Sequence, residues 1–579
     1  MPSIVDHDGR TRARFGGRVR PCSARKAIPC RAAIRAVVLL TLAALVPPST
    51  AAAADAPRWN ILFLFADDWG RYASCYAAAD RAAGVDRPGL CDVVKTPHVD
   101  RLAREGVLFR HAFVDAPSCT PCRSALLSGR AFFRCGQGAI LQGARWDDSI
   151  RSFPLALADA GYAIGKCGKV WSPGTPVDAP FGGQAHAFER AGMRARNWSE
   201  SATKLVDEGH GTEEAHAILA AEVAANFDAF LDSVPAGTPW HYWAGTTTTH
   251  RAWVAGSGKR LWGIDPDALA GRLPAALPDV PEVREDVADY LGEVQAVDRT
   301  LGALLARLEA RGELDRTLVV AAGDHGIPGV PRGKCNLHDL GTRVTLVARV
   351  PGGAGGRVVD DFLTLADLAP TFAAVGGTAL PNEESGRPLH GRSLLAHLTS
   401  RDSGRIAPER SAVVLGRERH VAAARAGNLP YPSRALRTDD WLYVRNFAPD
   451  RWPMGQPVPE DDEATAERAT PEAIASDTHA AYPDMDAGPT KAWLVAHADD
   501  RLARPFRDRA FAKRPAEELY DLRADPEQLV NLASDPAFAD ARARLATELL
   551  DRLRDAGDPR LEPDCPFERP PFTDPAPRR

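Results

Sequence analysis

Two acidic motifs carry side chains that could hold a divalent cation. Asp67 and Asp68 directly follow one continuous apolar run, and Asp324 begins a second motif after another such run. His325 comes next in that second motif. Carboxylate oxygens are the ligands that hard divalent cations prefer, so two strand ends could together form a cation site. For an isolated Asp-Asp pair, the alternative is that both side chains cap the next turn.

A cysteine motif lies between these acidic motifs. Residues 118–130 read Ser-Cys-Thr-Pro-Cys-Arg-Ser-Ala-Leu-Leu-Ser-Gly-Arg, which spaces Cys119 and Cys122 as Cys-X-X-Cys. This spacing could form a dithiol redox centre, or the two cysteines could be unreactive core residues. The redox interpretation requires a thioredoxin-like βαβ context, whereas here the motif belongs to a much larger ordered set.

Strand and helix patterns alternate over the first two thirds of the chain. Apolar runs typical of strands buried on both faces lie at residues 60–65, 107–114, 162–166, 240–245, 317–322 and 344–350. Helical patterns lie at residues 99–105, from 124 onward, 154–160, 213–231, 284–310 and 363–375. The alternation predicts an α/β domain with a mostly parallel central sheet flanked by helices. In such sheets, ligands bind at the carboxyl ends of the strands.

The pattern changes at about residue 405. Short antiparallel strands are indicated at residues 411–415, 435–438 and 441–447. A loop-rich stretch follows, then the segment 518–522 and a helix at about 536–555. We therefore predict a larger α/β domain over residues 55–404. A smaller C-terminal α+β domain follows over residues 405–579.

Residues 1–54 have the order of a signal peptide. They contain nine basic and two acidic residues, with an apolar run over residues 36–46 followed by small residues. This order predicts cleavage and export, to the periplasm or the extracellular space. An uncleaved membrane anchor is the alternative, but the run is too short to span a bilayer. No later run is comparable, so we expect no stable membrane insertion.

Charge and cysteine content limit the remaining possibilities. Without residues 1–54 the net charge is −12, against −5 for the whole chain, which argues against non-specific nucleic-acid binding. Eight of the ten cysteines remain, too few for a disulfide scaffold in a chain of this length. Cys75 and Cys91 flank a short loop and could form a disulfide, a pairing that sequence alone leaves open.

The ordered set of motifs resembles the sulfatase family of the alkaline-phosphatase-like superfamily. Its signature is Cys-X-Pro-X-Arg, then a short spacer and Leu-(Thr/Ser)-Gly, to which residues 119–129 are similar. Further segments that resemble the family lie at residues 95–106, 161–169, 249–251, 324–326, 333–344, 360–371 and 518–532. The resemblance implies the alkaline-phosphatase-like fold for the larger domain.

The resemblance also implies a nucleophile and a cofactor. In this family the cysteine is oxidised to formylglycine (3-oxoalanine) by a formylglycine-generating enzyme. The hydrated aldehyde attacks with one hydroxyl and then expels sulfate with the other. Carried over to this sequence, Cys119 is the modified residue, and one Ca²⁺ is bound by Asp67, Asp68, Cys119, Asp324 and His325. Arg123 would orient the nucleophile, and the sulfate would be surrounded by Lys169, His250 and Lys334.

Two positions depart from the family pattern. The family often has Gly-Lys-X-His, but Trp171 stands where that histidine would be. Either His250 or another residue must then protonate the leaving group. Cys122 is a milder departure, since serine is commoner there.

Within the family, residues 326–328, 336–342 and 431–437 resemble N-sulfoglucosamine sulfohydrolases (heparan N-sulfatases) more than arylsulfatases. The resemblance implies a sulfated saccharide substrate, as in glycosaminoglycan degradation. Candidate substrate contacts from the smaller domain are Glu418, His420, Arg434 and Arg437. Their alternative role is in ordinary salt bridges.

Two other functions stay open from the sequence. One is a phosphomonoesterase or phosphodiesterase of the same superfamily. The other is a non-catalytic glycan-binding relative in which Cys119 is unmodified.

Overall fold

The computed structural model describes residues 58–575, except residues 86, 384–385 and 458–469. The signal peptide predicted at residues 1–54 lies outside the described residues. The described residues belong to one compact unit, and the domain boundary expected at residue 404 stays a prediction. Among the described helices, none combines the length and apolar character needed to cross a membrane.

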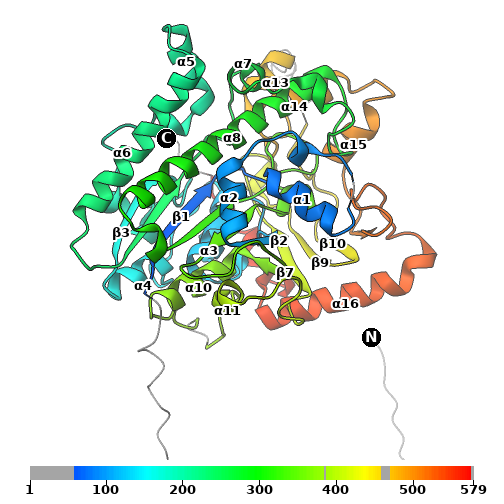
Figure 1. The fold of residues 1–579 in the computed structure, drawn as a ribbon. Helices are drawn as coiled ribbons and strands as arrows, with labels where there is room; N and C mark the ends of the chain where they lie inside the picture. The colour runs from blue at the N-terminus through cyan, green and yellow to red at the C-terminus, as the bar shows by residue number, and fades with distance from the viewer. Residues whose placement is uncertain (1–57, 86, 384–385, 458–469, 576–579) are drawn as a thin grey trace, which may run out of the picture. The chain divides into compact units, whose positions relative to one another are not determined.

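A seven-stranded sheet in the order β3-β4-β1-β5-β6-β2-β7 lies at the centre (Figure 1). Its strands are β1 (Asn60–Ala66), β2 (Val107–Phe113), β3 (Ala163–Gly168), β4 (Trp240–Gly245), β5 (Thr317–Gly323), β6 (Leu346–Arg349) and β7 (Arg357–Thr364). Neighbours are parallel except β6, which is antiparallel to β5 and β2. The predicted α/β class with a mostly parallel sheet is therefore confirmed.

Helices cover both faces of this sheet. One face packs against α2 (Pro97–Glu105), α6 (Thr212–Ser233) and α8 (Pro281–Ala310), and α8 runs across the sheet in Figure 1. The other packs against α3 (Cys119–Ser128), α4 (Phe153–Asp159) and α10 (Leu368–Val375). In β1, Leu62 and Leu64 are buried with the first group and Phe63 with the second. A strand buried on both faces needs apolar residues at every position, which explains its unbroken apolar run.

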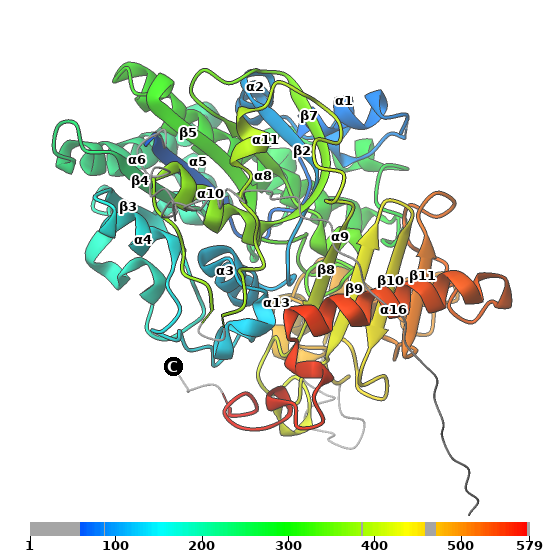
Figure 2. The ribbon, with the colours of Figure 1, turned by 90° about the horizontal axis from the view of Figure 1, so that it is seen from below.

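A second, antiparallel sheet has the order β11-β10-β9-β8. Its strands are β8 (Ala412–Arg417), β9 (Ser433–Thr438), β10 (Trp441–Asn446) and β11 (Glu517–Asp521). In Figure 2 the long helix α16 (Ala539–Ala556) lies across this sheet. The buried contact between helix and sheet includes Leu436, Tyr443, Leu519, Leu545, Leu549 and Leu553.

Two element predictions need correction. The helix expected over residues 363–375 begins only at Leu368, because residues up to Thr364 form β7. The acidic residues within β7 made this strand look polar, so it was not predicted. One of them, Asp361, is buried. Its carboxylate lies 3.1 Å from His397 Nε2 and accepts a hydrogen bond from the backbone N–H of Ile406. The stretch expected to be rich in loops contains short helices, two of which begin at proline, a residue well suited to the first helical position.

The remaining α-helices are α1 (Ser74–Ala82), α5 (Trp198–Asp207), α7 (Ser257–Trp262), α9 (Asp339–Thr342), α11 (Leu395–Thr399), α13 (Pro471–Ser476), α14 (Pro489–Ala496) and α15 (Arg504–Phe511). Cys75 and Cys91 are free thiols, as are the other cysteines among the described residues.

Truncating the apolar face of α16 tests the packing of the second sheet. Because Leu549 is fully buried, Leu549→Ala is expected to lower the free energy of unfolding by about 2–5 kcal/mol. Thr547→Ala, on the exposed side of the same helix, should change it by less than about 0.5 kcal/mol. Urea denaturation followed by circular dichroism measures both. Equal effects of the two variants would contradict the packing described.

Candidate active site

The two acidic motifs meet at one edge of the central sheet. β1 and β5 are parallel neighbours, with Ala66 paired with Gly323 at their carboxyl ends. Asp67 and Asp324 are therefore carried to adjacent positions, and the backbone N–H of Asp324 donates to Ala66 O at 3.1 Å. The backbone N–H of Asp68 donates to Asp324 Oδ1 at 2.7 Å, which ties the two motifs together.

Cys119 reaches this edge as the first residue of α3. Its Sγ lies 3.3 Å from His325 Nε2. Candidate ligand atoms of Asp67, Asp68, Cys119 and His325 all lie within 4.8 Å of one another, and all four residues are buried. The structure thus brings together motifs that are more than 250 residues apart in the sequence.

Three cationic side chains surround the carboxylates. Arg123, one turn along α3 from Cys119, donates from Nε to Asp324 Oδ2 at 2.9 Å and from Nη2 to Asp67 Oδ1 at 3.2 Å. Lys169 Nζ donates to Asp67 Oδ2 at 2.7 Å. Lys334 Nζ lies 3.1 Å from both oxygens of Asp68, with hydrogen-bond geometry toward Oδ2 only. All three cations predicted here from the sequence therefore contact the acidic cluster.

The neighbouring cations lower the pKa values of the carboxyl groups, whereas burial raises them. Burial favours the neutral form of Asp67, but the charges of Lys169 and Arg123 outweigh it and lower the pKa of Asp67. Burial and the neighbouring Asp67 raise the pKa of Asp324 to about 7. Burial also raises the pKa of Asp68, although Lys334 opposes it. Burial thus favours the neutral form of Asp68 and Asp324 despite the neighbouring cations.

The donor set fits a divalent cation. Burial lowers the pKa of His325 to about 4, so its imidazole is neutral at pH 7. Its Nδ1 faces the carbonyl of Gly326 at 3.3 Å and must carry the proton, which leaves a lone pair on Nε2. That lone pair faces carboxylate oxygens of Asp68 at 3.3 Å and Asp324 at 3.5 Å. Asp68 Oδ1 is buried without a hydrogen-bond donor. Acceptors that face one another in this way match the coordination of a cation.

His250 lies at the rim of the cluster. It is half-buried, and its Nδ1 faces Arg251 O at 2.6 Å, so that nitrogen carries the proton of the neutral ring. When its ring is protonated, His250 lowers the pKa of both Asp67 and Asp68. Its Nε2 has no hydrogen-bond partner among the described residues, which leaves that atom free for a substrate.

Sequence reasoning missed Asp486, which the C-terminal part of the chain brings to the cluster. Its Oδ2 lies 3.3 Å from Lys334 Nζ. Although burial opposes ionisation, the charge of Lys334 holds the pKa of Asp486 well below its usual range. The adjacent Asp484 anchors this loop through ion pairs of 2.6 Å with Arg417 and Arg425. Because the segment resembled a polar loop, no sequence signal marked it.

The four predicted substrate contacts of the smaller domain lie in different surroundings. His420 is buried with Nδ1 2.8 Å from the hydroxyl of Ser118, the residue before the nucleophile position. Arg434 is fully buried between Asp558 and Glu418, and Arg437 pairs with Asp339 at 2.8 Å. The structure therefore brings His420 close to Cys119, whereas the other three side chains bind partners outside the cluster.

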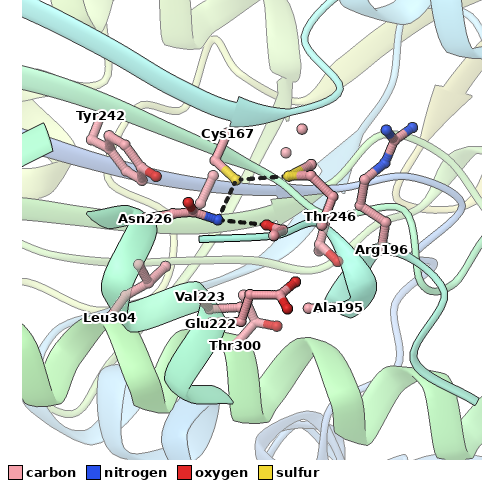
Figure 3. A pocket seen from close by; sticks show the side chains of 15 residues that line it. Cys167, Ala195, Arg196, Glu222, Val223, Asn226, Tyr242, Thr246, Thr300 and Leu304 are labelled. Carbon is pink, nitrogen blue, oxygen red and sulfur yellow. Dashed lines mark hydrogen bonds between the residues drawn. The ribbon is translucent and has the colours of Figure 1, made fainter. Parts of the chain in front are cut away.

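A mainly apolar pocket flanks the site at the carboxyl ends of β3 and β4 (Figure 3). Asn226 donates from Nδ2 to Gly192 O at 2.7 Å and to Cys167 Sγ at 3.9 Å. The Cys167 thiol in turn lies 3.6 Å from Met193 Sδ. These polar groups bind one another, as the dashed lines in Figure 3 show, while the charged Arg196 and Glu222 also line the pocket.

A family model described as Sulfatase matches residues 60–378, more than half of the chain. The chain belongs to the sulfatase family. The resemblance inferred from the motifs is thereby confirmed, and the enzyme class is that of sulfuric ester hydrolases.

Individual relatives agree with this placement. The sulfatase chain is 26% identical to human N-sulphoglucosamine sulphohydrolase over 530 residues, covering 86% of this chain and 89% of that one. Its fold is similar to a structure in complex with its substrate D-glucosamine-2-N,6-O-disulfate, with a TM-score of 0.54, 16% identity, and coverage of 86% and 98%. It is also similar to the phosphonate monoester hydrolase of Agrobacterium radiobacter, with a TM-score of 0.54, 19% identity, and coverage of 86% and 96%.

Removal of the Arg123 charge tests the ion network of this sulfatase. Arg123→Gln leaves two buried carboxylates without their shared partner, so the free energy of unfolding should fall by about 3–5 kcal/mol. Arg316→Gln is the matched control, because Arg316 is 65% exposed and its salt bridge among the described residues is with Glu313; it should cost less than about 1 kcal/mol. Both are measured by chemical denaturation in a chelating buffer. An unchanged midpoint for the Arg123 variant would show that the network contributes no stability.

Proposed function

We propose that the enzyme hydrolyses sulfate esters or N-sulfate groups on sulfated saccharides, using formylglycine made from Cys119 and one bound Ca²⁺. The observation that carries this proposal is the convergence of Cys119 with Asp67, Asp68 and His325, whose candidate ligand atoms lie within 4.8 Å. A nucleophile position beside a cation site and two lysines suits hydrolysis of an anionic ester.

Two relatives support the saccharide substrate. The human relative is named for N-sulfoglucosamine, and the structural neighbour binds a glucosamine disulfate. A second candidate function is hydrolysis of phosphoesters, because the phosphonate monoester hydrolase shares the fold. The substrate panel described below separates the two.

Each residue of the site has a separate proposed role. A hydrated formylglycine would supply the nucleophilic hydroxyl, and Ca²⁺, held by Asp67, Asp68, Asp324 and His325, would supply positive charge beside it. Lys169 and Lys334 would bind sulfate oxygens and stabilise the negative charge that develops on them. Asp486 keeps Lys334 charged and oriented through its ion pair.

His250 is the proposed source of the leaving-group proton. Hydrolysis breaks the bond between sulfur and the leaving oxygen or nitrogen, and the leaving atom must gain a proton. With Nδ1 bonded to the Arg251 carbonyl, the protonated ring of His250 presents its Nε2–H to the substrate. This assignment compensates for Trp171, which stands in place of the usual family histidine.

We also propose that the enzyme acts after export, in the periplasm or outside the cell. The order of basic, apolar and small residues within positions 1–54 supports this location. Formylglycine-generating enzyme is the proposed partner during maturation, acting on residues 119–123.

The chemical state of Cys119 tests the proposed nucleophile. In protein from the native host, the peptide containing residue 119 should have lost sulfur and two hydrogens and gained one oxygen. Cys119→Ala should lower turnover by more than about 10³-fold, as loss of a nucleophile does in other hydrolases. Cys122→Ser is the control and should retain turnover.

The same preparation is assayed with an aryl sulfate, an aryl phosphate and glucosamine N-sulfate. A free thiol together with saccharide binding but no turnover would support the glycan-binding alternative and refute the proposal. Faster turnover of the phosphate than of either sulfate would support the phosphoesterase.

Calcium titration tests the cation site without relying on activity. Isothermal titration of chelator-treated protein should give one Ca²⁺ per chain. Asp68→Asn should weaken Ca²⁺ binding by more than about tenfold, because it removes the charge of a residue proposed to bind the ion directly. Loss of a residue that only hydrogen-bonds to a metal ligand already weakens metal binding by about this much. Asp315→Asn is the control, since that side chain is 89% exposed. Equal affinities for the two variants would place the cation elsewhere.

The role of His250 predicts a dependence on the leaving group. His250→Gln should lower turnover of an alkyl sulfate by about 10²–10⁴-fold, the range of general acid catalysis. It should affect a nitrophenyl sulfate much less, because that leaving group departs without protonation. His210→Gln, whose side chain is 38% exposed, is the control. A uniform loss across both substrates would assign His250 to sulfate binding instead.

A further inference from the structure

A polar pocket separate from the one in Figure 3 is lined by the loops that follow Asp68 and that lead to Lys334. Arg71 contributes from the segment that follows Asp68, and Arg332 from the loop that leads to Lys334. Gln528, beyond β11, completes the wall. Arg332 is 7% exposed and Gln528 is 2% exposed. These side chains are therefore built into the protein rather than spread over its surface.

Several hydrogen-bond donors in this pocket have no partner among the described residues. They are Arg332 Nε and Nη1, Gln528 Nε2 and Arg71 Nε. Buried donors are almost always paired in native proteins, because an unpaired one keeps the full cost of losing water. An unpaired set around one pocket thus indicates a ligand that accepts hydrogen bonds.

The other polar atoms of these side chains fix their orientation. Gln528 Oε1 accepts from the backbone N–H of Asp339 at 3.0 Å, so its amide donor is the free end. Arg71 binds Asp80 through Nη1 and Nη2 at 2.7 and 2.6 Å. Arg332 Nη2 donates to the Tyr520 hydroxyl at 3.4 Å. The donors that remain cannot turn away without breaking these contacts.

The pocket also has a surplus of positive charge. Within the described part of the chain, Arg332 makes no salt bridge, and Arg343 reaches a carboxylate only at 4.0 Å, on Asp339. Asp339 is already paired with Arg437. Burial, followed by the charge of Arg71, lowers the pKa of Arg343 to about 9. An anion in the pocket would relieve this repulsion.

Glu527, the acidic residue next to Gln528 in the lining, is already engaged. Glu527 accepts from Arg87 at 2.6 Å through Oε1 and from the backbone N–H of Ala275 at 2.8 Å through Oε2. Glu527 is therefore not a hydrogen-bond partner of the unpaired donors in the pocket.

We propose that this pocket is a second binding site, specific for an oxyanion whose oxygens accept hydrogen bonds from Arg332, Gln528 and Arg71. The ligand chemistry is a sulfate or carboxylate group, carried either by an acidic saccharide or by free sulfate. The site does not depend on the proposed activity at Cys119. Arg71 follows Asp68 by three residues, and Arg332 precedes Lys334 by two. An anion bound here therefore contacts the loops that carry Asp68 and Lys334.

Isothermal titration of the full chain carrying Cys119→Ala, which prevents turnover, tests the proposal. Sodium sulfate and an N-sulfated glucosamine–uronate disaccharide are the two probes. Gln528→Glu keeps the acceptor for Asp339 N–H but replaces the free donor with an acceptor, so it should weaken one binding event at least tenfold. Arg332→Gln is the second variant and should act in the same direction. Arg316→Gln is the matched control: its side chain is 65% exposed, it does not line this pocket, and the variant should leave the isotherm unchanged.

The two probes distinguish the source of the anion. Sensitivity of sulfate binding to Gln528→Glu identifies a site for the free ion, whereas sensitivity of the disaccharide alone identifies a site for its acid group. The proposal is overturned if neither probe responds to either variant while circular dichroism shows both to be folded.

Discussion

The electrostatic repulsion among buried carboxylates is the constraint on which this active site depends. Asp67, Asp68 and Asp324 are each at most 1% exposed and lie at adjacent strand ends. Isolated charges in such surroundings are strongly disfavoured, and each must be paired or bound to a metal. Arg123 contacts two of them at once, which explains a fully buried arginine in the first turns of α3. Lys169 and Lys334 add two positive charges, but Asp486 adds a fourth carboxylate, so the cluster has four acidic and three basic side chains. The proposed Ca²⁺ would compensate this excess of negative charge.

The topology of the sheet makes this concentration of charge possible. Parallel neighbours β1 and β5 end at the same edge, and α3 begins there. The apolar packing on both faces of β1 fixes the strand ends, so the carboxylates cannot relax apart. The C-terminal part of the chain adds Asp486 and His420 to this edge, so the site is completed only when both halves of the protein are folded.

Much of this arrangement could be predicted from the sequence. Unbroken apolar runs identified β1 and β5, and the motif order placed Asp67, Asp324, Cys119 and both lysines at one site. Prediction failed where a local pattern was overridden by tertiary contacts. β7 was hidden because Asp361 is buried in it and compensated by partners distant in sequence. Asp486 was missed for the same reason, since only its contact with Lys334 gives it a role. Arg434 and Glu418 looked like substrate contacts, but charge alone cannot distinguish a ligand contact from a buried ion pair.

The most direct test of the central claim is a crystal structure of the mature enzyme grown with Ca²⁺, using anomalous scattering to locate the ion. The account predicts one cation coordinated by oxygens of Asp67, Asp68 and Asp324 at about 2.3–2.6 Å, in contact with residue 119. A structure that contains no cation there, or whose three carboxylates are neutralised by Arg123, Lys169 and Lys334 alone, would contradict it.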